Sequence, residues 1–285
     1  MAEKIRPMQR DELDLLINWA AEEGWNPGLH DAELFWNLDP EGFLALDLDQ
    51  EFCGGGAIIR HNSEFGFMGL FIVEETHRGK QHGRKLWYAR RDQLLKRLDE
   101  NATIGLDGVD AMVGFYKRGG FVPFTRYRRF TISEPLRADV TNPNIVPLAK
   151  VDPQLIADLD RQCFPGDRSA FLHDWIKQPQ SISLACIRGE ELQGFAVMRK
   201  CRSGWKIGPL FAEAASSAEQ LLVASRQQAQ EEPVFLDVPD NNPEAVQLCN
   251  SHEMTEVFGC TRMYFGPPPK LAHHKIFGIT TLEVG

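Results

Sequence analysis

The same order of helices and strands occurs twice along the 285 residues, and this repeat constrains the fold more than any other feature of the sequence. Each half reads as two helices, three strands, a helix, a strand, a short helix and a last strand. The expected strands are 43–48, 55–60, 65–73, 103–106 and 124–132 in the first half, and 181–188, 193–201, 205–212, 234–238 and 255–265 in the second. Since short polar turns separate the three consecutive strands, we expect antiparallel meanders flanked by helices, which is a mixed α/β fold.

Helices connect these strands at matching places. The two opening helices of the first half start near Asp11 and Asp31, and Asp11 is a residue type that caps helices. The other expected helices are 83–98, 110–118, 153–163, 168–177, 214–230 and 243–252. In the first helix Leu13, Leu16 and Ile17 share one face, which predicts that this face packs on the sheet.

A proline-rich segment separates the two halves. Residues 133–153 contain four prolines and no hydrophobic periodicity, so we place a linker there. A chain of this length is close to the point at which single hydrophobic cores stop growing. We therefore expect two domains, 1–135 and 145–285, each built around its own mixed, mostly antiparallel central sheet.

Composition excludes several classes of protein. The chain is 43% hydrophobic and 25% charged, as soluble globular proteins are, and its start lacks the apolar segment of a secretory signal, so a cytoplasmic protein is expected. The net charge of −9 argues against nonspecific binding to nucleic acid or to an anionic membrane. Six scattered cysteines without a Cys-x-x-Cys pair predict buried thiols, with no disulfide framework and no metal site.

Charge is unevenly distributed along the first half. Residues 11–51 hold twelve acidic side chains and no Lys or Arg, whereas residues 77–100 carry an excess of five positive charges. Charge blocks of this kind are most often solvated faces. The basic block is nevertheless informative, because it surrounds a strand, a polar turn with two glycines and the first turn of a helix.

That segment, 70–86, has the features of an anion site. Peptide N–H groups at a helix N-terminus, small residues that let the backbone approach, and flanking Arg and Lys would together suit a pyrophosphate. It is neither a Walker loop nor a Gly-x-Gly-x-x-Gly dinucleotide loop. On local chemistry alone, an ordinary strand-to-helix turn with surface charges fits about as well.

Two motifs together resemble the GNAT superfamily of N-acetyltransferases. The acetyl-coenzyme A loop of that family has the form Arg/Gln-x-x-Gly-x-Gly/Ala, five residues after a strand that ends in Val, and Val73, Arg78 and Gly83 match it. Gln81 occupies the place of the middle glycine, where a Gln in right-handed helical conformation could still present its N–H. Residues 110–121 resemble the family's second segment, an Asn or Asp, a helix, and Tyr-x-x-x-Gly-Phe, with Tyr116 as the tyrosine.

The resemblance implies two tandem GNAT-like domains and a role for each matching residue. The strand end would pair with the pantetheine arm of acetyl-coenzyme A, the loop would hold the pyrophosphate, and Tyr116 would protonate the departing thiolate. A phenol with a pKa of about 10 suits that task, although a tyrosine packed on the sheet is the simpler alternative. The residues implied for binding acetyl-coenzyme A are Phe71, Ile72, Val73, Arg78, Gly79, Lys80, Gln81, His82, Gly83, Arg84, Asp110 and Phe115.

The acceptor of the acyl group is expected to be a primary amine. In GNAT proteins the first two helices border the acceptor site, and here Glu23, Trp25 and Asn26 lie in an acidic, aromatic stretch that suits a small cationic amine. An alkyl amine must lose a proton before it attacks. Candidates for the base are Glu22, Glu23, Glu64 and His77, although residues of these types are more often surface or structural residues than a base.

The second half resembles a divergent acetyltransferase domain of bacterial tandem GNAT proteins. Residues 211–219, in its strand-to-helix slot, contain neither Arg nor Gly, and the place of Tyr116 falls on Cys249. This half could complete the acceptor pocket, form the interface of a homodimer, or bind coenzyme A in an altered way. Arg168, Asp237 and Asn242 could bind a ligand there, but each is as easily a cap or an ion-pair partner.

These observations predict an N-acetyltransferase that uses acetyl-coenzyme A and no metal. The amine would attack the thioester directly in a ternary complex, without a covalent enzyme intermediate. A noncatalytic sensor of an acyl-coenzyme A or another metabolite is the main alternative, motivated by Gln81 and by the divergent second half. A structural protein with a vestigial pocket is a third interpretation, and it predicts no affinity for coenzyme A.

Overall fold

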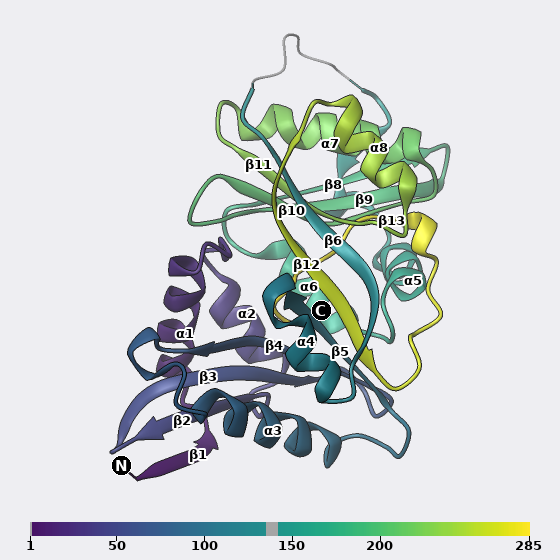
Figure 1. The fold of residues 1–285 in the computed structure, drawn as a ribbon. Coiled ribbons are helices and arrows are strands. Elements are labelled where there is room, and N and C mark those ends of the chain that lie inside the picture. The colour runs from purple at the N-terminus through teal and green to yellow at the C-terminus, as the bar shows by residue number, and fades with distance from the viewer. Residues whose placement is uncertain (1, 135–141) are drawn as a thin grey trace. The chain divides into compact units, whose positions relative to one another are not determined.

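The structure, a computed structural model, describes residues 2–134 and 142–285, and its contacts divide the chain into two compact units (Figure 1). Unit 1 holds the chain up to Pro123 together with Met263–Pro268 and Leu282–Gly285. Unit 2 holds Phe124–Arg262 and Pro269–Thr281. The fold is mixed α/β, as the sequence predicts.

The sheet of unit 1 has the strand order β1-β2-β3-β4-β5, followed by the end of β12. The neighbours from β1 to β4 are antiparallel, whereas β4 and β5 are parallel. These strands are β1 (Glu3–Pro7), β2 (Phe43–Leu48), β3 (Glu51–Arg60), β4 (Phe65–Val73), β5 (Thr103–Val109) and β12 (Thr255–Phe265). The antiparallel meander expected from the sequence is therefore confirmed as β2-β3-β4.

Helices cover both faces of this sheet. They are α1 (Arg10–Glu22), α2 (Asp31–Leu38), α3 (His82–Leu95) and α4 (Val113–Arg118), with the short 3₁₀ turns η1 (Glu75–His77) and η2 (Asp110–Met112). A side chain at Gly55 would meet Leu16 of α1, whereas one at the next residue, Gly56, would meet Arg90 of α3. Because successive strand residues point to opposite faces, α1 and α3 pack on opposite sides of β3.

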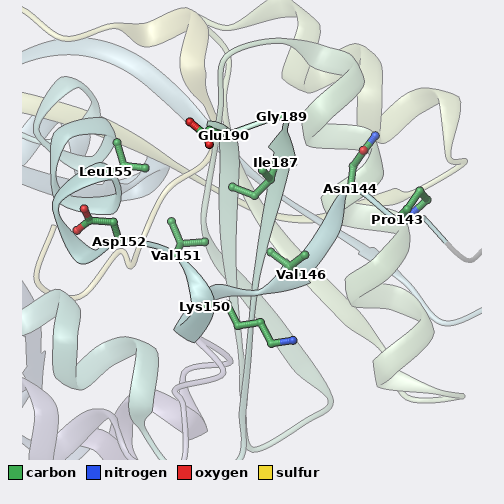
Figure 2. A pocket seen from close by; sticks show the side chains of 10 residues that line it. All are labelled: Pro143, Asn144, Val146, Lys150, Val151, Asp152, Leu155, Ile187, Gly189 and Glu190. Carbon is green, nitrogen blue, oxygen red and sulfur yellow. The ribbon is translucent and has the colours of Figure 1, made fainter.

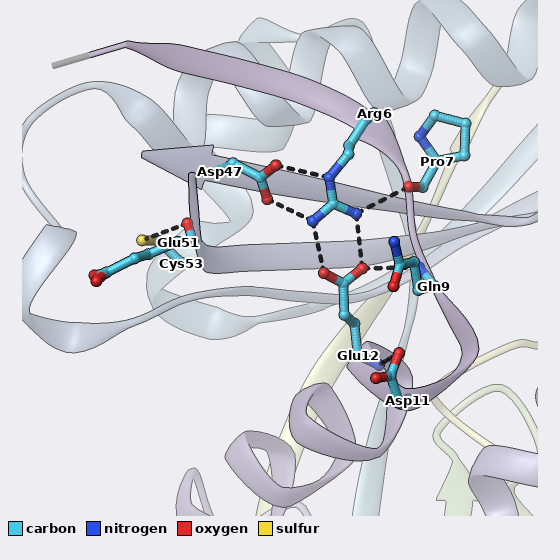
Figure 3. Close-up of polar contacts among 8 residues, drawn as sticks. All are labelled: Arg6, Pro7, Gln9, Asp11, Glu12, Asp47, Glu51 and Cys53. Atoms are coloured by element: carbon cyan, nitrogen blue, oxygen red, sulfur yellow. Dashed lines mark hydrogen bonds and ion pairs between the residues drawn. The ribbon is translucent and has the colours of Figure 1, made fainter. Parts of the chain in front are cut away.

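The first helix starts one residue earlier than expected, and its cap is different. Gln9 is the N-cap, and the Glu12 carboxylate accepts a hydrogen bond from the Gln9 N–H at 2.8 Å, so Asp11 lies within the first turn. Glu12 also takes part in an ion-pair network with Arg6 and Asp47, which ties α1 to β1 and β2 (Figure 3). The expected apolar face of this helix is confirmed, since Leu13, Leu16, Ile17 and Ala20 are all buried.

The sheet of unit 2 has the order β12-β6-β11-β10-β9-β8-β7, with β13 beside β10. Its further strands are β6 (Val122–Ile132), β7 (Ile145–Pro147), β8 (Ser181–Arg188), β9 (Glu191–Lys200), β10 (Trp205–Ala212), β11 (Val234–Pro239) and β13 (Ile276–Gly278). Its helices are α5 (Pro153–Cys163), α6 (Ser169–Lys177), α7 (Ala215–Ala229) and α8 (Pro243–Ser251), with the 3₁₀ turns η3 (Leu148–Lys150) and η4 (His273–Lys275). Its core is lined by residues of β6, β9, β10, β11, α7 and α8.

Each unit contains strand residues from the other half of the sequence. In unit 2, β6 pairs antiparallel with β11 from Tyr127↔Pro239 to Ile132↔Val234. In unit 1, Met263 and Phe265 of β12 pack in the core that also holds Tyr116 and Phe121. The two compact units therefore do not coincide with two uninterrupted stretches of chain.

The expected linker is in part regular structure. Residues 135–141 of the predicted 133–153 segment lie outside the described residues, but the remainder contains β7 and η3. The short strands β1, β7 and β13 were not expected, because three to five residues carry too little periodicity to be recognised. All six cysteines are free and buried, as expected. Among the described residues, no helix is both long and apolar enough to cross a lipid bilayer.

Candidate active site

Two parallel strands of unit 1 separate where the predicted cofactor residues lie. The pairing of β4 with β5 runs from Phe65↔Thr103 to Met68↔Leu106 and stops there, although the strands continue to Val73 and Val109. We call the diverging ends, 69–73 and 107–109, the β4–β5 fork. Phe71, Ile72 and Val73, the predicted pantetheine contacts, lie on this fork, at a strand edge that β5 leaves unpaired.

A bulge lies at the base of this fork. Leu70 has a φ of +48°, and the register between β3 and β4 shifts between Gly55 and Ala57. Gly69 has no room for a side chain, because a Cβ there would lie 1.8 Å from the carbonyl oxygen of Glu283. The Leu282–Gly285 segment therefore packs against β4 at the bulge, where it brings the buried residue Glu283, which sequence reasoning did not single out.

The predicted pyrophosphate loop follows the fork and leads into α3. Gln81, its N-cap residue, has a φ of +68° and a ψ of −3°, which is left-handed conformation. The expectation of a right-handed Gln81 is therefore wrong. The same left-handed conformation explains why the family's motif has a glycine at this place, because a residue with a Cβ adopts it at a cost of about 1–2 kcal/mol. Space remains at Gly79, where no atom lies within 4 Å of a built Cβ.

The basic side chains of this loop are not all free to meet an anion. The Arg78 guanidinium donates hydrogen bonds to the carbonyl oxygen of Val73 at 2.7 Å and to the carboxylate of Glu23. The Lys80 ammonium donates to the carbonyl of Thr76. Arg84 lies 5.8 Å from the centroid of the Tyr88 ring. Because these groups are exposed and weakly held, an incoming pyrophosphate can exchange with the present partners at low cost.

Tyr116 is positioned by aromatic packing and by a glycine. Its ring lies 6.1 Å from that of Trp87 and 5.5 Å from that of Phe115, and a Cβ at Gly108 of β5 would come within 2.7 Å of it. Only a glycine in β5 therefore leaves room for this ring. Burial raises the pKa of Tyr116 to about 12, and the positive charge of Arg90 opposes that rise. The phenol is protonated at neutral pH, as a proton donor must be.

Arg90 is a fully buried cation that joins the bulge to α3. Its guanidinium donates to the carbonyl oxygens of Ala57 at 2.6 Å and Gly69 at 2.5 Å, and it lies 5.0 Å from the centroid of the Phe71 ring. Gly56 opposite it has no side chain, and a Cβ there would lie 2.4 Å from the guanidinium carbon. Burial lowers the pKa of Arg90 to about 10, so the group stays charged at neutral pH.

The sequence contains a signal for Arg90 that composition does not reveal. Leu86, Arg90 and Leu94 share the buried face of α3, so a charged side chain lies on an otherwise apolar stripe. A buried charge is costly unless it serves a bond or a reaction. The Arg90 guanidinium has hydrogen bonds to two carbonyl oxygens at the bulge, and its charge acts on the nearby phenol of Tyr116. We therefore regard Arg90 as part of this site.

The equivalent strands of unit 2 also diverge, but another strand lies between them. β10 and β11 pair in parallel only from Trp205↔Val234 to Ile207↔Leu236. Beyond that point β13 pairs with β10, with Leu210↔Gly278 and Phe211↔Ile276 as partners, and the Ile279 N–H donates to the Asp237 carbonyl of β11. We call this the β10–β11 fork, and β13 occupies it.

The uncertain residues of the second half have structural roles. Arg168 pairs with Asp160, and Asp237 pairs with Arg129, all of them buried. The Asn242 side chain caps α8 and also donates to the Ile276 carbonyl, which holds β13 in place. Cys249, at the place of Tyr116, is fully buried, and burial raises its pKa to about 12. These positions provide ion pairs, a cap and core packing rather than open ligand contacts.

Both halves of the chain match models of one family. Residues 10–121 match the acetyltransferase (GNAT) family, and residues 156–278 match the acetyltransferase (GNAT) domain. The chain belongs to the GNAT acetyltransferases. The members of this family use acetyl-coenzyme A as cosubstrate. The β4–β5 fork and the loop after it lie within residues 10–121, which the first of these models matches.

Relatives cover almost the whole of this tandem GNAT chain. Holothin acyltransferase of Pseudoalteromonas sp. is 28% identical over 98% of this chain and 94% of its own length, which supports acyl transfer as the reaction class. A crystal structure of a protein from Pyrococcus horikoshii has a TM-score of 0.84 at 22% identity, over 99% of this chain and 96% of that one. A tandem GNAT protein from the clavulanic acid biosynthesis pathway has a TM-score of 0.67 at 11% identity, over 94% and 100%. The two structures show that the fold is shared.

The predicted acceptor residues lie at the end of α1 in this GNAT unit. Glu23 is exposed and bonded to Arg78, while Trp25 and Asn26 are half-buried. Two other aromatic residues of the stretch pack on strands, with Trp19 stacked on Phe52 and Trp36 stacked on Phe43. Of the remaining cofactor predictions, His82 is buried and bonded to Glu3, Asp110 begins η2 and is exposed, and Phe115 packs edge-on against Trp87. Their contacts with coenzyme A stay predictions.

An open hollow of about 470 Å³ on unit 2 is lined by none of the predicted site residues (Figure 2). Its charged groups, Lys150, Asp152 and Glu190, are exposed. A binding site for a small polar molecule normally has a few polar groups that converge on a mostly apolar cavity. The β4–β5 fork, rather than this hollow, is therefore the candidate active site.

Proposed function

We propose that unit 1 is an N-acetyltransferase that transfers the acetyl group of acetyl-coenzyme A to a primary amine, with direct attack in a ternary complex. The observation that carries this proposal is the β4–β5 fork, which leads into the basic loop before α3 and lies beside the buried phenol of Tyr116. An unpaired strand edge suits the amide groups of pantetheine, and the N-terminus of α3 with its basic neighbours suits a pyrophosphate.

Tyr116 and Arg90 support the departure of the thiolate. When the amine attacks the thioester carbon, the carbon–sulfur bond breaks, and Tyr116 supplies a proton to the sulfur. The phenolate that remains is stabilised by the Arg90 cation, which lowers the pKa of Tyr116 against the effect of burial. General acid catalysis of this kind contributes about 10²- to 10⁴-fold. Arg90 acts through Tyr116 and the bulge, so it is a positioning residue.

The ion pair between Arg78 and Glu23 supports a cationic acceptor and an order of binding. Arg78 comes from the pyrophosphate loop and Glu23 from the expected acceptor side. When a pyrophosphate binds Arg78, the Glu23 carboxylate loses its partner and becomes available to a cationic amine. Acetyl-coenzyme A would then bind first, and initial-rate kinetics with a dead-end amine analogue would show uncompetitive inhibition against acetyl-coenzyme A.

Calorimetric titration with acetyl-coenzyme A tests the assignment to unit 1. We expect one site per chain, and we expect binding to be lost when Arg78→Ala and Gly83→Glu are combined. The first substitution removes a positive charge, and the second puts a carboxylate in the space that the pyrophosphate would occupy. The matched control is Glu213→Ala with Ala215→Glu in the corresponding slot of unit 2, which should leave binding unchanged. Two sites per chain, or a loss in the control alone, would contradict the assignment.

A noncatalytic sensor of an acyl-coenzyme A is the second candidate. This candidate would be favoured if the protein binds acetyl-coenzyme A but releases no coenzyme A thiol with any primary amine in a screen. The similarity to holothin acyltransferase supports turnover over a binding role alone. The partners that we propose are a small-molecule amine and a second copy of the chain in a homodimer, which sedimentation equilibrium of the full chain would detect.

A further inference from the structure

Three potential metal ligands meet beside the candidate active site, although the sequence places them far apart. The donor atoms of Cys53, Glu74 and His77 all lie within 4.8 Å of one another in unit 1. Cys53 is on β3, Glu74 follows the end of β4, and His77 ends η1. A spacing of 21 residues and then three matches no short zinc motif, so a metal site here was not expected from the sequence.

Backbone pairing brings these residues together. The Glu74 N–H donates to the Cys53 carbonyl at 2.9 Å, which continues the pairing of β3 with β4. The His77 N–H then donates to the Glu74 carbonyl at 2.9 Å, so that the single turn of η1 returns the imidazole to Glu74. The arrangement therefore depends on a strand pair and a closed turn rather than on mobile side chains.

The three side chains have donor atoms that could bind a cation. Nδ1 of His77 is buried and has no hydrogen-bond partner, while Nε2 lies 3.4 Å from the Glu74 carboxylate. The Cys53 side chain is buried, and its thiol donates to the Glu51 carbonyl at 3.2 Å (Figure 3). Burial, together with the charges of Glu74, Glu51 and Asp47, raises the pKa of this thiol, so it keeps its proton when no cation is near.

We propose that Cys53, Glu74 and His77 form a zinc-binding site. A thiolate, an imidazole and a carboxylate are three of the ligand types that zinc prefers, and a fourth position would stay open to water. On binding, the hydrated zinc ion would exchange waters for the Cys53 sulfur, an imidazole nitrogen of His77 and a carboxylate oxygen of Glu74, and the thiol proton would pass to solvent. The inference goes beyond the proposed acetyl transfer and does not depend on it.

A zinc ion here would connect β3 to the turn just before Arg78. Because zinc binds the folded arrangement of the three ligands and not the separated residues of an unfolded chain, it would raise the melting temperature. It would also hold η1, and with it the start of the pyrophosphate loop, in one conformation. The effect is a stabilised entry to the loop, with no part in the chemistry at the thioester.

Cobalt(II) titration of the full chain tests this site without any substrate. The protein is stripped with a chelator and kept reduced with a phosphine, and cobalt is then added, because tetrahedral cobalt with a thiolate ligand gives an intense near-ultraviolet charge-transfer band. We expect one equivalent of cobalt to produce the band, one equivalent of zinc to abolish it, and zinc to raise the melting temperature.

Substitutions then assign the ligands. Cys53→Ser should abolish the thiolate band, and His77→Ala and Glu74→Gln should each weaken zinc binding at least tenfold. The matched controls are Cys201→Ser, at a buried cysteine of unit 2 that forms no disulfide, and His173→Ala, at a histidine on α6, and both should leave the band and the affinity unchanged. Circular dichroism and acetyl-coenzyme A titration report whether each variant is folded.

Two outcomes would overturn the site. One is the absence of a thiolate band in the folded wild-type chain, and the other is a band of unchanged intensity in folded Cys53→Ser. If Cys53→Ser does not fold, Glu74→Gln decides the matter, since this side chain is partly exposed and its loss should not disturb the core. If the wild-type chain gives the cobalt–thiolate band but transfers no acetyl group to any amine, that result would count against the proposed function and not against the zinc site.

Discussion

The two units contain the same kind of fork, and they differ in what lies within it. In unit 1 β4 and β5 diverge after Met68 and Leu106, and the strand order of the described residues places no third strand between them. In unit 2 β10 and β11 diverge after Ile207 and Leu236, and β13 pairs with β10 in the gap. One copy of the fold leaves the edge of its fork unpaired, and the other pairs that edge with a strand of its own chain.

The segments that follow the two forks differ in the same direction. The segment after β4 has two glycines and several basic residues, whereas 211–219 after β10 has neither Arg nor Gly. Because β13 fills the fork of unit 2, a pantetheine arm could not pair with the strand edge there. Because the segment that follows has no positive charge, it would also attract a pyrophosphate only weakly. The comparison shows that the same element order occurs once with an open fork and a basic loop, and once with a filled fork and no basic residue in the corresponding segment.

The largest expected difference between the units concerns the proton donor. Tyr116→Phe should lower kcat by about 10²- to 10⁴-fold while the dissociation constant of acetyl-coenzyme A changes little, because only the proton donor is lost. Cys249→Ala, at the equivalent place in unit 2, should leave kcat unchanged. Steady-state kinetics and calorimetry separate the two effects, and equal losses in both variants would break the comparison.

Filling the second fork should be necessary for the stability of unit 2. Gly278→Val should lower the free energy of unfolding by about 1–3 kcal/mol, since a Cβ at this position would lie 2.4 Å from a methyl carbon of Leu236. The control is Gly114→Ala in α4, where a Cβ meets nothing closer than 3.8 Å and where alanine favours the helix. Urea unfolding would measure both, and an unaltered Gly278→Val protein would mean that β13 is not needed there.

Arg90 should matter for the chemical step more than for cosubstrate binding. Arg90→Met removes the charge that opposes the effect of burial, so the pKa of Tyr116 should rise further and the phenolate should become harder to form. We expect kcat to fall about tenfold with a smaller change in KM for acetyl-coenzyme A.

Arg90→Lys is the conservative variant for this test, because it keeps the charge. It should recover a large part of the kcat that Arg90→Met loses. A purely structural role for Arg90 would lower kcat and thermal stability alike in both variants. Parallel kinetics and melting curves distinguish these outcomes.

The smallest effect is expected at the left-handed residue of the loop. Gln81→Gly should stabilise the chain by about 1 kcal/mol, because glycine reaches this conformation without a Cβ clash. Gln180→Gly is a matched control in unit 2, since Gln180 is also exposed and has a φ of +52°. Both should gain stability, but only Gln81→Gly should tighten acetyl-coenzyme A binding. Equal affinities would show that the loop already approaches the pyrophosphate closely.

Much of the fold follows from local sequence. The bounds of β2, β4, α5, β8, β10 and β12 agree with the sequence prediction, because alternation, periodicity and turn residues act over a few neighbouring positions. The conformation of Gln81 was not predictable in this way, since its neighbours force a geometry that its own preference opposes. The cap of α1 was misassigned for a related reason, because Glu12 supplies the bond from within the helix.

The candidate site divides in the same manner. The sequence alone determined the strand, the loop and Tyr116, since the motif places them at fixed short distances. It showed Arg90 as a charge on an apolar stripe, but its bonds to Ala57 and Gly69 depend on the packing of α3 on the sheet. Nothing in the sequence placed Glu283 against the bulge, because that contact joins residues more than two hundred positions apart.

The sequence by itself thus determined a tandem α/β chain in which a basic loop with two glycines follows one strand, and a segment without Arg or Gly follows its counterpart. Only the tertiary structure decided that β13 fills the second fork, that each unit takes in strand residues from the other half of the sequence, and that Cys53 meets Glu74 and His77. The physical reason is range. Helices, turns and motifs arise from bonds between near neighbours, whereas the closing of a gap depends on which distant segment gains most from being buried there.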